Sequence, residues 1–172
     1  MKRNFKIAVV VAFLLSAVMM IQCSDKRVSA YILNGYRFKN PRSVGICSNS
    51  EEYGTRIRGY AKKWNVYSAL HLVDTNLTSA KITATVYDYN KEGVYAETSH
   101  NSTTHSIVFY SAWIDTDMAK QNEIIVHEFG HAVGLAHCAP RDVNEAVMRA
   151  TGFNGYAYPL SDDKAGIRAL YK

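Results

Sequence analysis

The chain has 172 residues, a formal net charge of +5 and 48% hydrophobic residues. This length predicts one domain, and no internal repeat or low-complexity tract interrupts it. The positive charge is uneven, because residues 1–30 carry five cationic side chains and one anionic side chain, a net of +4. The rest of the chain therefore carries about +1, which gives no reason to expect nucleic acid or acidic membranes as partners.

Residues 1–30 have the pattern of a secretory signal peptide. Three basic residues lie within the first six, and Ile7–Ile21 is an uncharged, mostly apolar run of fifteen. Val28-Ser29-Ala30 then places small residues at the −3 and −1 positions of a cleavage site. We therefore expect a secreted protein whose mature domain is 31–172.

Two alternatives to a cleaved signal peptide stay open. The first is an uncleaved membrane anchor, against which fifteen apolar residues are fewer than the ~20 that a spanning helix needs. The second is a lipoprotein lipidated at Cys23, against which Gln22 is bulky and polar where such sites usually have a small residue. We expect no stable membrane span in the mature form.

The apolar periodicity predicts strands and a helix in the first half of the mature chain. Tyr31–Phe38 alternates enough for a strand. From Ser50 to Trp64 the apolar residues recur at helical intervals behind a good N-cap. Strands follow at 67–73 and 81–88, and Ser106–Ile114 is a further β-rich run.

Two helices are predicted in the second half. A long helix begins near Asp117, a good N-cap, and a short helix, Ser161–Tyr171, ends the chain. Ser161 is the expected N-cap of the short helix, with Asp162 and Asp163 in its first turn. This order predicts an α+β domain in which helices pack on one twisted mixed sheet.

Residues 127–137 read H-E-F-G-H-A-V-G-L-A-H, the spacing H-E-x-x-H-x-x-G-x-x-H of a zinc site. His127 and His131 are four residues apart, so on a helix they lie on one face and reach one metal ion. Gly134 permits a positive φ, which is costly for other residues. The helix can end there, so that His137 returns as the third ligand of one catalytic Zn²⁺.

Glu128 directly follows the first histidine and does not need to bind the metal itself. Zinc held by three neutral imidazoles keeps an open fourth position. We expect Glu128 to accept the proton of a water molecule there and to return it to the leaving amine of a peptide bond. The substrate is expected to be an extended peptide that lies along an edge strand within Ser106–Ile114.

These residues resemble the metzincin clan of zinc endopeptidases, in which the same motif is followed by a Met-turn. Met148 lies eleven residues past His137, where the resemblance implies the methionine beneath the ligands. Residues 159–171 resemble the terminal helix of the matrixin branch, L-S-x-D-D-x-x-G-I-x-x-L-Y, with one residue absent. The resemblance implies that Asp162 and Asp163 hydrogen-bond the Met-turn backbone. The alternatives are an ordinary core methionine and simple helix N-terminal charge.

The chain departs from the matrixin pattern at three places. No P-R-C-G propeptide motif is present, since Pro41-Arg42-Ser43 lacks the cysteine. The H-x-D segment of a second, structural zinc is also missing, and we expect His100 and His105 to be surface residues of a Ser/Thr-rich loop. Arg149 follows Met148 where matrixins commonly have tyrosine and proline, so the side-chain preference at S1′ is open.

Two cysteines, Cys47 and Cys138, remain once Cys23 is removed. Outside the cell they can pair, which would close a loop of about ninety residues and contribute on the order of 4 kcal/mol. The alternative is two free thiols, because a sequence does not show proximity.

Calcium is a weaker prediction for the cofactor set. Asp88, Asn90 and Glu92 offer oxygen ligands within one loop, and a solvated turn is the preferred interpretation. A proton-donating tyrosine, as some metzincins use, would be Tyr156 or Tyr158, for which packing is the preferred interpretation.

Two other functions stay open beside a monomeric zinc endopeptidase. One is a zinc-containing module that binds peptides without turnover. Glu128 argues against it, because a structural zinc site gains nothing from a base and tends to have four protein ligands. The other is a hydrolase of a non-peptide amide, such as a cell-wall link.

Overall fold

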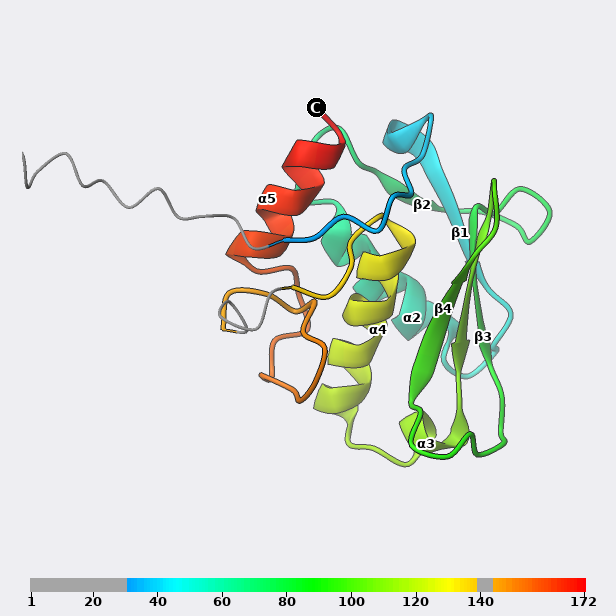
Figure 1. Ribbon diagram of the computed structural model, residues 1–172. Helices are drawn as coiled ribbons and strands as arrows, with labels where there is room; N and C mark the ends of the chain where they lie inside the picture. The colour runs from blue at the N-terminus through cyan, green and yellow to red at the C-terminus, as the bar shows by residue number, and fades with distance from the viewer. Residues whose placement is uncertain (1–30, 139–143) are drawn as a thin grey trace, which may run out of the picture.

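The computed structural model describes residues 31–138 and 144–172, which fold around a five-stranded sheet (Figure 1). The strand order is β2-β1-β3-β5-β4, in which β4 is antiparallel to β5 and the other neighbours are parallel. The strands are β1 (Val44–Ser48), β2 (Leu72–Asp74), β3 (Ile82–Val86), β4 (Ala96–His100) and β5 (His105–Phe109). The predicted α+β class is confirmed, and the predicted signal peptide, with Cys23, lies outside the described residues.

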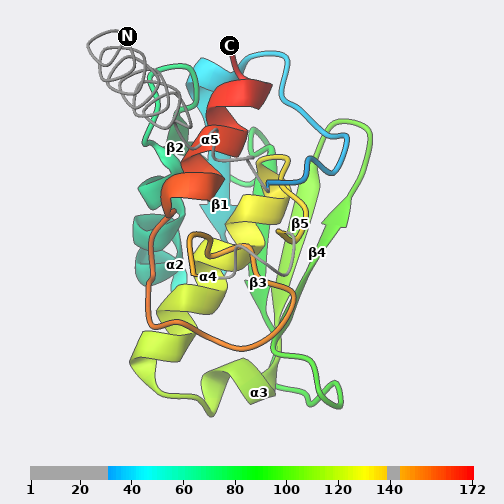
Figure 2. The same cartoon turned by 60° about the vertical axis from the view of Figure 1, so that its left-hand side comes forward.

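The helices lie mainly on one side of this sheet. The longer ones, α2 (Gly54–Ala61) and α4 (Met118–Ala132), cover the same face in both views (Figures 1 and 2). The remaining helices are η1 (Pro41–Ser43), η2 (Lys62–Trp64), α3 (Ser111–Ile114) and α5 (Ser161–Leu170). No helix in the two described ranges is long and apolar enough to cross a membrane.

The α4 helix forms the centre of the domain. Asp117 is its N-cap as predicted, and its carboxylate accepts a hydrogen bond from the Lys120 backbone N at 2.9 Å. Ile125 and Phe129 are buried against the sheet layer, each contributing roughly 1.5–3 kcal/mol by burial. The buried Trp64 indole donates to the Val126 carbonyl at 2.9 Å. These contacts anchor α4 over the sheet.

Several strand boundaries differ from the prediction. Residues 31–38 form no strand apart from one bridge between Leu33 and Leu135, because the Asn34 backbone N donates to the Gly134 carbonyl and so ties this segment to the end of α4. The predicted strand at 67–73 is reduced to β2. Two bonds between Leu72 and the Asn65 side chain, of 2.7 and 3.1 Å, hold the chain before it in a turn.

The edge of the sheet is also not where it was predicted. Ser106–Ile114 divides into β5 and α3, and β5 lies between β3 and β4. The exposed edge on this side is β4, a strand the sequence analysis missed because its burial pattern hardly alternates. β1 was missed too, because its buried residues are consecutive and do not alternate with exposed ones.

The terminal helix α5 packs against the end of α4. The Tyr171 hydroxyl donates to the Val133 carbonyl at 2.9 Å, and Ile167 is fully buried. Ser161 is the first residue of α5 and not its cap, which corrects the prediction. Asp163 supplies the capping contact, because its carboxylate accepts a bond from the Leu160 backbone N at 2.8 Å.

Candidate active site

The last turns of α4 place two histidines on one helix face, and a glycine turn returns a third. The Nδ1 atom of His127 lies 2.9 Å from the Val147 carbonyl, and that of His131 lies 2.8 Å from the Leu135 carbonyl. Gly134 has φ +109°, so the helix ends where predicted.

The three imidazoles converge through their Nε2 atoms. His137 Nε2 lies 3.3 Å from that of His127 and 3.2 Å from that of His131. Three nitrogens bound tetrahedrally to one Zn²⁺ lie about 3.3 Å apart, given Zn–N bonds of ~2.0–2.1 Å. This donor set therefore fits zinc. Among the described residues, it forms the one group of three or more His, Cys, Asp or Glu ligands within 4.8 Å of one another.

Burial keeps the imidazoles of His127 and His131 neutral. It lowers the pKa of both His127 and His131 to about 4. The carbonyl contacts at Nδ1 place the ring proton there, which directs the Nε2 lone pairs at the shared point. Neutral rings with inward lone pairs are the form in which imidazole binds a metal.

Glu128 lies beside this cluster with its side chain buried. The Thr98 hydroxyl, on β4, lies 2.6 Å from Glu128 Oε2 and 3.1 Å from the Glu128 carbonyl. Burial raises the pKa of the Glu128 carboxyl, and the Thr98 hydrogen bond opposes that rise. Sequence analysis missed Thr98, because no local motif links residues thirty positions apart.

The segment after the histidines packs beneath them. Met148 is buried, and a Cβ added at Gly130 would meet its Sδ at 2.1 Å. The Asp163 carboxylate accepts bonds from the Val147 and Met148 backbone N atoms at 2.8 and 3.3 Å. The metzincin resemblance implied this contact for both members of the acidic pair, and the structure shows it for Asp163. Sequence analysis missed Gly130, although a glycine inside a predicted helix is itself a signal of close packing.

The partner carboxylate, Asp162, is also buried in the first turn of α5. Its backbone N donates to the Glu145 carbonyl at 3.0 Å. Burial raises the pKa of the neighbouring Asp163 to about 6, against three backbone hydrogen bonds that lower it.

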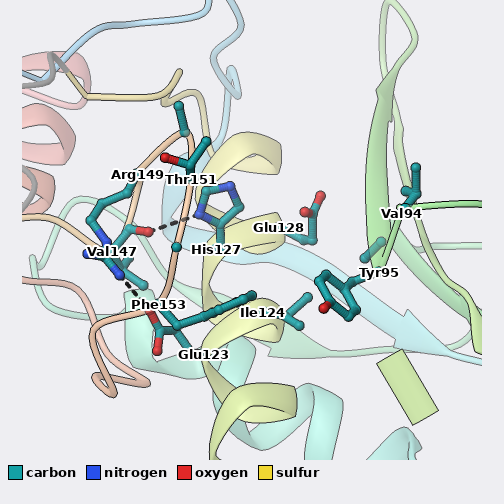
Figure 3. Close-up of a pocket in the computed structure, with 14 residues that line it drawn as sticks. Val94, Tyr95, Glu123, Ile124, His127, Glu128, Val147, Arg149, Thr151 and Phe153 are labelled. Atoms are coloured by element: carbon teal, nitrogen blue, oxygen red, sulfur yellow. Dashed lines mark hydrogen bonds and ion pairs between the residues drawn. The ribbon is translucent and has the colours of Figure 1, made fainter. Parts of the chain in front are cut away.

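A pocket of about 410 Å³ opens beside His127 and Glu128 (Figure 3). Its apolar lining comprises Val94, Tyr95, Ala96, Ile124, Val147, Ala150 and Phe153. Glu123 and Arg149 also line it, as a buried ion pair with 3.7 Å between Oε1 and Nη2. The Glu123 carboxylate accepts bonds from the backbone N atoms of Asn154 and Gly155, which anchors the loop that forms one wall.

Comparison with known proteins places this site in a family. A family model described as Matrixin matches residues 36–172. The chain belongs to the matrixin family. It is therefore a zinc metalloendopeptidase, with the catalytic zinc implied by that family.

The fold of this matrixin is similar to that of other solved structures. The structure of myroilysin matches with a TM-score of 0.58 and 14% sequence identity, over 82% of this chain and 98% of that one. At this identity the match supports the fold alone. No curated protein matches the sequence.

The predicted disulfide of this matrixin is not formed. Cys47 lies on β1 in the sheet, whereas the Cys138 backbone N donates to the Met148 carbonyl at 2.6 Å. No bridge joins the two cysteines. The sequence left both outcomes open, because it does not show whether two cysteines are close, and the structure favours the alternative without a bridge.

His100 and His105 are not surface loop residues of the matrixin domain, which corrects a second prediction. They end β4 and begin β5, and their Nδ1 atoms lie 2.8 Å apart across the strand pair. His105 is buried, which lowers its pKa to about 4, and the Tyr36 ring stacks on His100 with centroids 4.1 Å apart.

The other predicted residues do not belong to the group of ligands that the three histidines form. Tyr156 and Tyr158 are exposed, with ring centroids 5.5 Å apart, and neither lines the pocket beside Glu128. Asp88, Asn90 and Glu92 are exposed and, within the described part of the chain, belong to no ligand group of the kind that the histidines form. The calcium site stays a prediction.

Proposed function

We propose that this matrixin is a secreted endopeptidase in which His127, His131 and His137 hold the catalytic Zn²⁺ and Glu128 is the general base. The observation that carries the proposal is the approach of three Nε2 atoms, 3.2 and 3.3 Å apart at His137, beside a buried carboxylate. Zinc at such a site supplies a Lewis acid for the peptide carbonyl and lowers the pKa of water.

The proposed role of Glu128 follows from its surroundings. Burial raises the pKa of the Glu128 carboxyl, so this carboxylate binds a proton from water more tightly than an exposed carboxylate does. Glu128 takes a proton from the attacking water and delivers it to the leaving amine nitrogen. The first transfer generates the nucleophile, and the second prevents reformation of the peptide bond.

The proposed substrate is an extended peptide paired with the free edge of β4. In the described ranges β4 pairs with β5 alone, so its outer edge offers main-chain donors and acceptors. This assignment replaces the predicted edge within Ser106–Ile114. The neighbouring pocket of about 410 Å³ receives one substrate side chain, and its mostly apolar walls favour an apolar residue there.

The proposed supporting residues hold the ligands from below. Gly134 makes the turn that returns His137, and Met148 is the Met-turn methionine. Asp163 holds the backbone of that turn, and Asp162 completes the buried acidic pair at the start of α5.

Secretion and domain division complete the proposal. We infer a signal peptide at 1–30 and a monomeric catalytic domain at 31–172, with no nucleic acid partner. The support is the basic-then-apolar pattern of the first segment, and a family match that begins at residue 36.

A Glu128→Gln variant tests the mechanism against the zinc-containing peptide-binding module. We expect the variant to retain one equivalent of zinc and to lose casein hydrolysis by on the order of 10²–10⁴. Glu51→Gln, an exposed carboxylate in the turn before α2, is the control and should match the wild type.

Unchanged hydrolysis by Glu128→Gln contradicts the role of Glu128. A wild-type protein that binds zinc and peptide but cleaves neither casein nor short peptides supports the binding module. Cleavage of amide-linked glycans alone supports the non-peptide alternative.

A further inference from the structure

The Glu128 carboxylate is held by a side chain from the opposite side of the cleft. Thr98 Oγ1 lies 2.6 Å from Glu128 Oε2, a short distance of the kind seen when a hydroxyl donates to an ionised oxygen. Thr98 Oγ1 also lies 3.1 Å from the Glu128 carbonyl oxygen, so this hydroxyl lies between two acceptors of the same residue. Nothing in the zinc motif requires this contact.

The position of Thr98 is set by the sheet and not by a flexible loop. It is the central residue of β4, and it pairs with Ile107 of β5, which is fully buried. Strand residues alternate between faces, and Glu97 on the other face contacts Lys91 and Tyr110. Thr98 is therefore directed at α4 by a strand whose neighbours are held in place.

A carboxylate that exchanges protons with water and substrate has to present one defined oxygen to them. Glu128 has three side-chain torsions, and rotation about the last of them exchanges its two oxygens. A hydrogen bond at Oε2 removes that freedom and leaves Oε1 as the oxygen that meets the reactants. Ordering the base before reaction lowers the entropic cost of the transition state.

We propose that Thr98 is a positioning residue for the general base: its hydroxyl holds Glu128 Oε2, so that Oε1 is presented to water and substrate. This inference rests on the proposed role of Glu128. It also connects substrate docking with catalysis, because the strand that carries Thr98 is the one on which the extended peptide is proposed to lie. A peptide that pairs with β4 rigidifies the strand that orients the base.

Two substitutions at this position separate the hydroxyl from the shape of the side chain. Thr98→Val keeps the β-branched shape and removes the donor, whereas Thr98→Ser keeps the donor. With the zinc-loaded enzyme and a peptide substrate, we expect Thr98→Val to lower kcat on the order of ten- to hundredfold, with KM nearly unchanged, because the lost bond to a charged group acts in the chemical step. Thr98→Ser should restore most of kcat.

The matched control is Thr85→Val, the same chemical change at a half-buried position of β3, a strand inside the same sheet. Zinc content and the thermal midpoint are measured for every variant, and Thr98→Ala serves as a second donor-free variant if Thr98→Val does not fold. A merely structural role would shift the thermal midpoint or KM and would leave kcat of the folded, zinc-loaded variant unchanged.

The positioning role of Thr98 and the general-base role of Glu128 are contradicted by different results. If Glu128→Gln is inactive while Thr98→Val and Thr98→Ala keep the wild-type kcat, the positioning role is overturned and the general base stands. A rise in KM at constant kcat, or equal losses in Thr98→Val and Thr98→Ser, also overturns it. If Glu128→Gln keeps its activity, the proposed function itself fails.

Discussion

The two sides of the active-site cleft are built in different ways. On the α4 side, every group proposed to bind metal or transfer protons falls within residues 127–137, and one helix and one turn set their positions. The groups that surround this segment come from farther along the chain. The Thr98 hydroxyl contacts the Glu128 carboxylate from thirty residues away, and the Asp163 carboxylate contacts the Val147 backbone from sixteen residues away. The comparison shows that a local motif defines the ligands, whereas long-range pairing defines what surrounds them.

Removal of the third ligand should have the largest effect, because it destroys the metal-binding group that the local motif defines. His137→Ala leaves two imidazoles, too few for a stable catalytic zinc site. We expect zinc affinity to fall by more than about a hundredfold, the upper range for loss of a group that only supports a ligand, with peptidase activity lost alongside. His71→Ala, an exposed histidine before β2, is the control. Metal content after dialysis checks this, and a stoichiometric ion in His137→Ala would contradict it.

Gly134→Ala tests how the helix end sets the third ligand. Its positive φ disfavours alanine, and a Cβ would meet Leu170 Cδ2 at 2.4 Å and the Tyr36 carbonyl oxygen at 2.6 Å. We expect a loss of about 1–3 kcal/mol from strain, or more because of the clash, measured by chemical denaturation. Gly152→Ala, with φ +73° and no atom within 4 Å of the added Cβ, isolates the strain alone. Equal losses in the two variants would mean that the close approach at Gly134 costs nothing.

Asp163→Asn tests the long-range contact between α5 and the Val147–Met148 backbone through the pH dependence of stability. Burial raises the pKa of Asp163 from 3.8 to about 6, so the folded state binds this proton more tightly than the unfolded state. The contribution of the carboxyl to stability is therefore full below about pH 4 and is lost as the pH rises to about 6, by up to about 3 kcal/mol.

Asparagine does not titrate, so the difference in unfolding free energy between wild type and Asp163→Asn reports this group. We expect the advantage of the wild type to shrink between pH 4 and pH 6, with both proteins measured in chelator so that zinc release does not contribute. An advantage that grows with pH would mean that the three backbone hydrogen bonds outweigh burial.

The smallest expected effect concerns the cysteines. With no bridge between Cys47 and Cys138, a reducing agent should leave the thermal midpoint of the wild type unchanged. Cys47→Ala, at a half-buried position at the end of β1, should behave in the same way. A midpoint that falls on reduction in the wild type but not in Cys47→Ala would restore the disulfide prediction.

Sequence reasoning was most successful where the signal is short-range. The start of α4 at its Asp117 cap, the glycine turn and the course of β3 all follow from patterns a few residues long. It failed for Tyr31–Phe38 and for the sheet edge. Whether an extended segment joins a sheet, and at which position, depends on partners far away in the chain.

The sequence by itself determined the histidine triad, the adjacent carboxylate and the α+β class, because helix periodicity and the steric demands of glycine act within a few residues. Only the tertiary structure decided that β4 is the edge strand, that Thr98 contacts Glu128, that His105 is buried and that Cys47 stays apart from Cys138. Those features depend on which strands pair and on which face of the sheet the helices cover. The strand pairing and the covered face are determined by the free energy of burying the whole core, to which segments far apart in the chain contribute together.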